Sequence, residues 1–439
     1  MRVSELWIRN FKSLRDVRLE LNQFNLVVGP NGSGKTNLID ALEFLRESLA
    51  ARGMPRPWRR WWRPENVVWI RDETLPLAFG FKFEAGEYRA SYEVTCSVTG
   101  GEFRIEGEVL SVEGWGKLER AGSTLSVSYE DVFIEKAEKS GVERELLEPE
   151  EVKGVLGPRD SLVRNLPISF LRRRKDIGAG FELLRFHLLR GGELTLVVPR
   201  LEKSIIGREL IKLRRPLLPP SIMDNLVAFL CYMVRAVIGG IVIVRPLNLQ
   251  ALRKPQEYVR TLQLESDCSN LYIVLYNLFL RRNRLPDRIA KVLSVAFKDY
   301  ELLFDLTEDG RVFVKLVHDD LTLPPPCMPD GFHKLVAVLT ALELRPSILA
   351  IDELENSLHP RLVELIVDLL KSSDTVVIAT THSPAAVDIA EPEDLVLAEM
   401  TGSGTVFRRL RNTAKIREEL KRYGITLSER WLWGRVEVE

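Results

Sequence analysis

A segment near the N-terminus has the residue spacing of a phosphate-binding loop. It reads Gly29-Pro30-Asn31-Gly32-Ser33-Gly34-Lys35-Thr36 and fits the pattern GxxxxGK(S/T). The glycines let backbone N–H groups face a phosphate at a helix N-terminus, where the helix dipole also favours an anion. We expect Lys35 to bridge the β- and γ-phosphates of ATP and the Thr36 hydroxyl to ligate Mg²⁺. The residues expected to bind ATP are Asn31, Gly32, Ser33, Gly34, Lys35, Thr36 and Asn37.

Two adjacent carboxylates far along the chain supply chemistry that such a loop needs. They follow the apolar run Ile348 to Ile351, which predicts a buried strand. In P-loop enzymes a carboxylate placed in this way holds Mg²⁺, so we expect Asp352 to be a metal ligand. Glu353 is placed to polarise the attacking water as a general base. The alternative, a solvated strand end that merely carries charges, is disfavoured by the phosphate loop.

A histidine follows a third apolar run. Thr375 to Ala379 predicts another buried strand, and it leads into Thr380-Thr381-His382-Ser383-Pro384. Pro384 suits the first turn of a helix. A lone histidine is more often structural, but beside the two other motifs we favour a sensor of the γ-phosphate. The predicted catalytic residues are therefore Lys35, Glu353 and His382.

The elements that must position these residues can be predicted from periodicity. Phe24 to Val28 predicts a buried strand before the loop, and apolar residues at helical spacing after Thr36 predict a helix. Antiparallel strands are expected over 77–83, 88–94 and 103–110, and a strand over 241–249. Three domains follow: 1–110, the N-terminal half of the ATPase head; 111–240, a mainly helical insertion; and 241–439, the C-terminal half with alternating helices and strands.

Composition excludes several classes of protein. The 439 residues carry no net charge, so no global field draws the chain to nucleic acid or to a membrane. Four scattered cysteines do not form a disulfide framework or a zinc motif, which fits a reducing cytoplasm. The apolar stretch 226–244 is interrupted by Arg235 and Gly239-Gly240. It therefore favours a helix, a break and a strand over a membrane span. With no signal peptide at its start, we expect a cytoplasmic protein without membrane contact.

The order of the motifs resembles a known class. Residues 8–14 (IRNFKSL), the loop GPNGSGKTN, 351–360 (IDELENSLHP) and 381–384 (THSP) resemble the ABC-type ATPases of the SMC/RecF/OLD class. More closely, they resemble its stand-alone AAA-family predicted ATPases in bacteria and archaea. The resemblance implies an α/β fold, that of an ABC/SMC-like P-loop NTPase with an antiparallel N-terminal lobe, a parallel core sheet and a helical insertion. The heptads of SMC coiled coils are absent. With 57 residues after His382, we expect no Toprim nuclease domain.

The resemblance also implies a homodimer that closes on ATP. In this class the signature segment of one subunit caps ATP held by the other. The matching residues here are Pro329, Asp330, Gly331 and Lys334, followed by a helix. Pro329 stands where the class has a serine, which puts efficient hydrolysis in doubt. Asn356 would lie in the D-loop, which crosses the dimer axis.

Three basic clusters could contact DNA: 56–63, 172–175 and 281–284. Arginines interleaved with aromatic residues suit phosphate neutralisation and base stacking, and we expect Arg172, Arg173 and Arg174 to contact DNA. The alternative for each cluster is a solvated face or an ion-pair network. The leading hypothesis is an ATP-driven, dimerising switch that acts on DNA or on a separately encoded nuclease or other effector, in repair or anti-phage defence. The alternative is a regulatory scaffold with little turnover and no DNA binding.

Overall fold

The computed structural model describes residues 2–49, 56–85, 88–138, 150–153, 161, 185–188, 194–197, 210–212, 231, 233–298 and 300–432. The chain divides into two compact units. The larger unit contains Arg2–Phe81, Val98–Glu102 and Ala236–Glu439, and the smaller unit contains Lys82–Ser97 and Phe103–Arg235. The phosphate loop and the Asp352-Glu353 pair both lie in the larger unit.

A six-stranded sheet forms the centre of the larger unit, with the strand order β13-β17-β18-β3-β19-β20. Its strands are β3 (Phe24–Val28), β13 (Ile241–Val244), β17 (Ile348–Ile351), β18 (Val376–Thr381), β19 (Leu395–Thr401) and β20 (Gly404–Arg409). All neighbours run parallel except β19 and β20. Strands β3, β17 and β18 are buried along their whole length, which explains their continuous apolar runs. The predicted parallel core is confirmed.

Three neighbouring strands of this sheet end at the predicted motifs. Strand β3 leads into the phosphate loop, β17 into Asp352 and β18 into His382. In the register, Ile351 pairs with Ala379 and Thr381 pairs with Val28. Because parallel strands present their carboxyl ends at one edge of the sheet, segments distant in sequence meet there.

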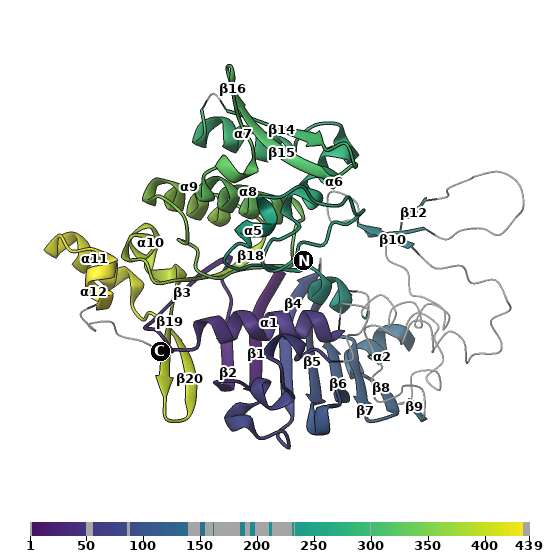
Figure 1. The fold of residues 1–439 in the computed structure, drawn as a ribbon. Helices are drawn as coiled ribbons and strands as arrows, with labels where there is room; N and C mark the ends of the chain where they lie inside the picture. The colour runs from purple at the N-terminus through teal and green to yellow at the C-terminus, as the bar shows by residue number, and fades with distance from the viewer. Residues whose placement is uncertain are drawn as a thin grey trace, which may run out of the picture. The chain divides into compact units, whose positions relative to one another are not determined.

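Helices pack on this sheet, and in Figure 1 α8 and α9 lie side by side. The helices of the larger unit are α1 (Lys35–Leu49), α5 (Leu249–Leu252), α6 (Leu271–Arg282), α7 (Asp287–Ala296), α8 (Asp330–Glu343), α9 (Pro360–Lys371), α10 (Pro384–Ile389), α11 (Thr413–Tyr423) and α12 (Leu427–Leu432). Helix α8 is buried from Phe332 to Leu342 and forms part of the main hydrophobic core. The helices predicted after the phosphate loop and at the signature segment are confirmed.

Antiparallel strands complete the larger unit. They are β1 (Arg2–Phe11), β2 (Leu14–Glu20), β14 (Glu301–Leu306), β15 (Val312–His318) and β16 (Leu321–Leu323). Strand β1 pairs with β2, and β15 pairs with both β14 and β16. Short 3₁₀ helices are η1 (Arg59–Trp61), η2 (Pro64–Val67), η3 (Trp69–Arg71), η4 (Thr99–Gly101), η6 (Pro325–Cys327) and η7 (Pro392–Asp394).

The smaller unit is mainly an antiparallel sheet, which corrects one prediction. Strand β4 (Leu77–Ala85) runs from the larger unit into the smaller one. There five strands pair antiparallel in chain order, as Figure 1 shows. They are β5 (Tyr88–Ser97), β6 (Arg104–Val112), β7 (Gly116–Ala121), β8 (Thr124–Tyr129) and β9 (Glu150–Lys153). The other elements of this unit are α2 (Asp131–Glu138), β10 (Arg185–Leu188), β11 (Leu194–Val197) and β12 (Leu210–Lys212).

The prediction that residues 111–240 are mainly helical was therefore wrong for their described N-terminal part. Strand β7 alternates buried and half-buried positions, which is the two-residue period of a strand. At the other end of the segment, residues 233–239 are helical and β13 follows Gly240, as the interrupted apolar stretch predicted.

The strand predicted over 241–249 is shorter than expected. It ends at Val244, because Arg245 turns its backbone N–H to the carbonyl of Ser266 and Pro246 has no N–H to donate to a sheet. Helix α5 begins after Asn248, whose side-chain carbonyl accepts a hydrogen bond from the Ala251 N–H at 3.2 Å.

Candidate nucleotide-binding site

The phosphate loop joins β3 to α1 and holds its lysine against its own backbone. Lys35 is 5% exposed, and its Nζ donates to the carbonyls of Gly29 at 2.8 Å and Pro30 at 2.9 Å. Burial lowers the pKa of Lys35, and the nearby carboxylates of Asp352, Glu355 and Glu353 oppose this shift. The lysine therefore lies near three carboxylates while it donates to neutral carbonyls of its own loop.

Two hydroxyl side chains from distant segments brace the loop. Ser13, in the turn between β1 and β2, lies 2.7 Å from the Thr405 hydroxyl of β20. The Asn37 side chain donates to the same Ser13 oxygen at 2.7 Å. Gly34 lies against this pair with φ +94°, where a Cβ would lie 2.1 Å from Thr405 Oγ1. A side chain at residue 34 would clash, so this position requires glycine.

Asp352 lies within reach of the loop hydroxyl that was predicted to share its metal. Its Oδ1 is 3.4 Å from Thr36 Oγ1 and accepts a 2.8 Å hydrogen bond from Thr380 Oγ1. The Asp352 N–H donates to the Val244 carbonyl at 2.8 Å, which fixes the backbone at the end of β17.

A hydroxyl and a carboxylate are the oxygen ligands that Mg²⁺ accepts, and the ion takes its remaining ligands from water and phosphates. Among the described residues, no group of three His, Cys, Asp or Glu side chains could hold a metal ion. Thr36 and Asp352 therefore fit an ion that binds together with the nucleotide.

Glu353 is held in an unusual backbone conformation beside Asp352. Its φ is +50°, a left-handed value that is costly for a residue with a Cβ, and such strain concentrates at functional sites. The Glu353 N–H donates to Thr380 Oγ1 at 2.9 Å. Its Oε2 accepts from Asn356 Nδ2 at 2.9 Å, so the predicted D-loop residue orients the predicted base within one chain.

Glu355 was not anticipated from the sequence and fixes the end of β18. Its Oε2 accepts from Thr381 Oγ1 at 2.7 Å, and its Oε1 accepts from the His382 N–H at 2.8 Å. The His382 side chain is exposed. The backbone of the predicted sensor is thus anchored to the carboxylate segment, whereas its ring faces solvent.

A buried arginine that was not identified from the sequence as a site residue connects Asp352 to α1. Arg245 Nη1 lies 3.4 Å from Asp352 Oδ2, and Nε and Nη2 donate to Glu43 Oε2 at 3.0 and 2.6 Å. Nη2 also contacts Asp40, whose other oxygen contacts Lys12 Nζ. Burial alone would lower the pKa of Arg245, but the charges of Glu43 and Asp40 outweigh it and raise that pKa.

The signature segment corrects one predicted contact. Pro329 is exposed and precedes α8, Asp330 accepts from Arg253 Nη2 at 2.7 Å, and a Cβ on Gly331 would lie 3.0 Å from the Ser357 carbonyl. Lys334, by contrast, is 1% exposed, and its Nζ donates to the Glu353 carbonyl at 3.3 Å in the same chain. It was predicted to reach a second subunit, but its position one turn into α8 directs it into the core.

The basic clusters differ in what they contact. Arg172, Arg173 and Arg174 lie outside the described residues. In the cluster 56–63, Arg60 Nη1 bonds both oxygens of Glu43 at 2.7 and 2.8 Å. Trp61 packs its ring 6.1 Å from that of Phe11. For Arg60 the alternative, an ion-pair network, is the one observed, whereas Trp61 is half-buried. Trp62 is 89% exposed.

Two family models match the chain. The first, described as an AAA ATPase domain, matches residues 1–76. The second, described as "AAA domain, putative AbiEii toxin, Type IV TA system", matches residues 247–388. The first match contains the phosphate loop, and the second contains the Asp352-Glu353 pair.

Curated relatives match over short segments. The DNA replication and repair protein RecF of Glaesserella parasuis serovar 5 is 52% identical over 46 residues, 10% of this chain and 13% of that protein. The chromosome partition protein Smc of Methanococcus voltae is 38% identical over 53 residues, 12% of this chain and 4% of that protein. The chain thus spans a small part of the length of these relatives.

Solved structures that resemble the chain include an SMC head bound to the C-winged helix domain of ScpA. It has 13% sequence identity and a TM-score of 0.48, and the match covers 93% of this chain and 97% of that one. The SMC head domain from Thermotoga maritima has 14% identity and a TM-score of 0.39, with coverages of 94% and 100%.

Within the described ranges, no helix has both the length and the apolar composition needed to cross a membrane.

Proposed function

We propose that the chain is an ATP-hydrolysing switch that dimerises when ATP is bound. It has the motifs of SMC/RecF-like AAA ATPases and matches AAA family models over residues 1–76 and 247–388. One observation carries this proposal: the phosphate loop and the carboxylate pair meet at one edge of the parallel sheet. Thr36 Oγ1 lies 3.4 Å from Asp352 Oδ1, although 316 residues separate them in the sequence.

The proposed roles follow from the contacts of each side chain. Lys35 would leave the carbonyls of Gly29 and Pro30 for phosphate oxygens, which are charged and therefore stronger acceptors. Thr36 and Asp352 would hold Mg²⁺, which when bound neutralises charge on the β- and γ-phosphates.

Glu353 is the proposed general base. As the oxygen of the attacking water bonds to the γ-phosphorus, the bond from that phosphorus to the β–γ bridging oxygen breaks, and the proton of the water passes to the Glu353 carboxylate. The hydrogen bond from Asn356 keeps this carboxylate oriented. His382, anchored at its N–H by Glu355, is the proposed sensor of the γ-phosphate.

Closure would place the N-terminus of α8 of one subunit over the nucleotide of the other. Pro329 is exposed at that end, and a helix N-terminus attracts an anion. Lys334 is left out of this cap because it is buried in its own subunit. Since Pro329 has no hydroxyl to offer the γ-phosphate, we expect slow turnover.

The proposed target is DNA or a separately encoded nuclease or other effector, in repair or anti-phage defence in the cytoplasm. The same proline favours a second candidate, a regulatory scaffold that closes on ATP with little turnover and does not bind DNA.

The test is the oligomeric state of the Glu353→Gln variant. Glutamine keeps the shape of the side chain but cannot accept the proton, so hydrolysis should slow by about 10²–10⁴-fold while ATP stays bound. Light scattering should then detect a dimer with Mg²⁺-ATP and a monomer with Mg²⁺-ADP. The reason is that ATP, unlike ADP, binds the closed dimer more tightly than the open monomer.

Two further variants serve as controls. Glu364→Gln makes the same change at an exposed position of α9 and should hydrolyse ATP at the wild-type rate. Lys35→Ala should lose ATP binding and stay monomeric with either nucleotide. Equal masses of Glu353→Gln with ATP and with ADP would refute closure driven by ATP.

A further inference from the structure

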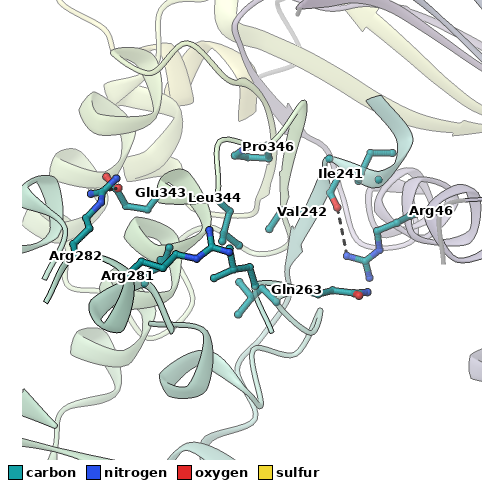
Figure 2. A pocket seen from close by; sticks show the side chains of 14 residues that line it. Arg46, Ile241, Val242, Gln263, Arg281, Arg282, Glu343, Leu344 and Pro346 are labelled. Atoms are coloured by element: carbon teal, nitrogen blue, oxygen red, sulfur yellow. Dashed lines mark hydrogen bonds and ion pairs between the residues drawn. The ribbon is translucent and has the colours of Figure 1, made fainter. Parts of the chain in front are cut away.

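A cavity of about 590 Å³ lies in the larger unit, away from the phosphate loop. Figure 2 shows its lining, which comes from the C-terminal half of α1, the start of β13, residues 262–264 and the C-terminal ends of α6 and α8. Its residue on α1, Arg46, lies eleven positions after Lys35, or about 16 Å along the helix at 1.5 Å per residue. The cavity is therefore separate from the proposed ATP site.

The side chain of Arg46 is buried at one end of the cavity and is incompletely satisfied. Arg46 is 8% exposed, and its Nη1 donates to the Ile241 carbonyl at 3.5 Å, drawn as the dashed line in Figure 2. Its Nε is buried without a hydrogen-bond partner. No carboxylate lies within ion-pair distance of Arg46 among the described residues. A buried cation without an anionic partner is costly, so this group is suited to receive an anion.

A second arginine faces the same space. In Figure 2 the side chain of Arg281 extends across the cavity, whereas Arg282 turns to Glu343 at the far end, 3.4 Å from its Oε2. Glu343 is thus engaged by Arg282, and Arg281 has no ion pair among the described residues. With three arginines and one glutamate in its lining, the cavity carries an excess of positive charge.

The rest of the lining is apolar apart from the Gln263 side chain, which lies near Arg46 in Figure 2. Val242, Leu264, Leu278 and Leu344 contribute hydrocarbon surface. A volume of about 590 Å³ is within the range of small-molecule sites, which are largely apolar with a few polar groups that fix orientation.

We propose that this cavity binds a small amphipathic anion, with a carboxylate or phosphate head between Arg46 and Arg281 and an apolar body against Leu264 and Leu278. Gln263 donates a hydrogen bond to the same head. The charge selects an anion, and the hydrocarbon wall selects a molecule with an apolar body over a bare inorganic ion.

Calorimetry on the full chain tests the proposal with sodium octanoate, octyl phosphate and 1-octanol as probes. Both anions should bind, and 1-octanol should bind at least about tenfold more weakly, because it lacks the charge-assisted hydrogen bonds. Arg46→Met keeps the apolar part of the side chain and should lower the affinity for octanoate at least about tenfold. Arg281→Gln, a change at an exposed position that leaves the core intact, should also weaken it.

Arg284→Gln is the matched control. Arg284 is an exposed arginine three residues after Arg281, pairs with Asp287 at 3.4 Å and does not line the cavity, so octanoate affinity should stay unchanged. A comparison of octanoate with octyl phosphate shows which head group the site prefers. Failure of the wild type to bind either anion, equal affinity for 1-octanol, or an equal loss in Arg284→Gln would each overturn the proposal. None of these readouts depends on ATP binding or turnover.

Discussion

At the scale of single residues, Asp352 has different neighbours on its two oxygens. Oδ1 is near Thr36 and Thr380, on the side of the predicted metal, whereas Oδ2 faces Arg245. One oxygen can therefore turn to a ligand while the other stays fixed by a buried cation. Arg245 touches no expected substrate atom, so it acts as a positioning residue for the carboxylate.

The first prediction concerns the removal of that cation. Arg245→Met should leave Glu43 and Asp352 buried without their common partner, which costs about 3–5 kcal/mol of unfolding free energy for a buried pair. Arg245→Lys keeps the positive charge but not the planar guanidinium, so it should lose less unfolding free energy than Arg245→Met. Urea denaturation of the three proteins measures both effects.

The control is Arg311→Met, which breaks an exposed pair with Asp309 and should change stability by less than about 1 kcal/mol. If Arg245→Met were as stable as Arg311→Met, the cluster would not be a structural support of Asp352.

At the scale of elements, the phosphate loop depends on two segments outside its own strand and helix. The turn between β1 and β2 supplies Ser13, and β20 supplies Thr405, whose N–H also donates to the Ser13 carbonyl at 2.8 Å. The loop is thus closed in by segments at both ends of the chain. Its conformation depends on the folded larger unit and not on the local sequence alone.

The second prediction tests this packing through two glycines of the loop. In Gly34→Ala the new Cβ would meet Thr405 Oγ1 at 2.1 Å and Ser13 Oγ at 2.9 Å, with φ at +94°. We expect ATP affinity to fall by at least about a hundredfold, since the loop must shift. Calorimetric titration with Mg²⁺-ATP measures this loss.

Gly32→Ala is the comparison, because φ is +77° there but nothing lies within 4 Å of a Cβ. It should show only the cost of the backbone conformation, about 1–2 kcal/mol. Equal losses in the two variants would mean that backbone strain alone, without the contact to Thr405, limits the loop.

At the scale of the whole molecule, the neutral net charge leaves local clusters as the only basic surfaces. In the described cluster at 56–63, Arg60 forms an ion pair with Glu43, and the half-buried Trp61 ring packs against Phe11 and Phe44. It therefore offers less to a polyanion than its composition indicated. DNA binding remains a proposal, and it rests on Arg172, Arg173 and Arg174 and on the exposed cluster 281–284.

The third prediction is that DNA affinity falls steeply with salt and that these three arginines set part of the slope. Each neutralised phosphate contributes about 0.9 to the slope of log K against log salt, so changing all three to Gln should flatten it by up to about three. Fluorescence anisotropy with a labelled duplex, with and without ATP, measures the slope.

A triple variant with the same charge change, Arg311→Gln, Arg408→Gln and Arg417→Gln, controls for net charge, because each of these arginines lies outside the three clusters and pairs with a surface carboxylate. Equal slopes in the two triple variants would remove the 172–174 cluster from the interface. Absence of wild-type binding at all salt concentrations would favour the scaffold without DNA.

Motifs whose chemistry depends on local spacing could be predicted from the sequence alone. The phosphate loop, the Asp352-Glu353 pair and the strands before them were readable because buried parallel strands require continuous apolar runs, and a loop that binds phosphate requires glycines at fixed positions.

Which charged residues serve these motifs depends on the tertiary structure. Arg245 was not singled out by any local pattern, and Lys334 was predicted to be part of a signature segment that reaches a second subunit. Arg245 is buried among three carboxylates, and the buried Lys334 donates a hydrogen bond to the Glu353 carbonyl. The partner that satisfies a buried charge can be hundreds of residues away, 205 for Arg245 and Asp40, and no local pattern encodes such a pairing. The same holds for the Arg46 cavity, because its walls come from segments that meet only when the sheet and its helices have packed.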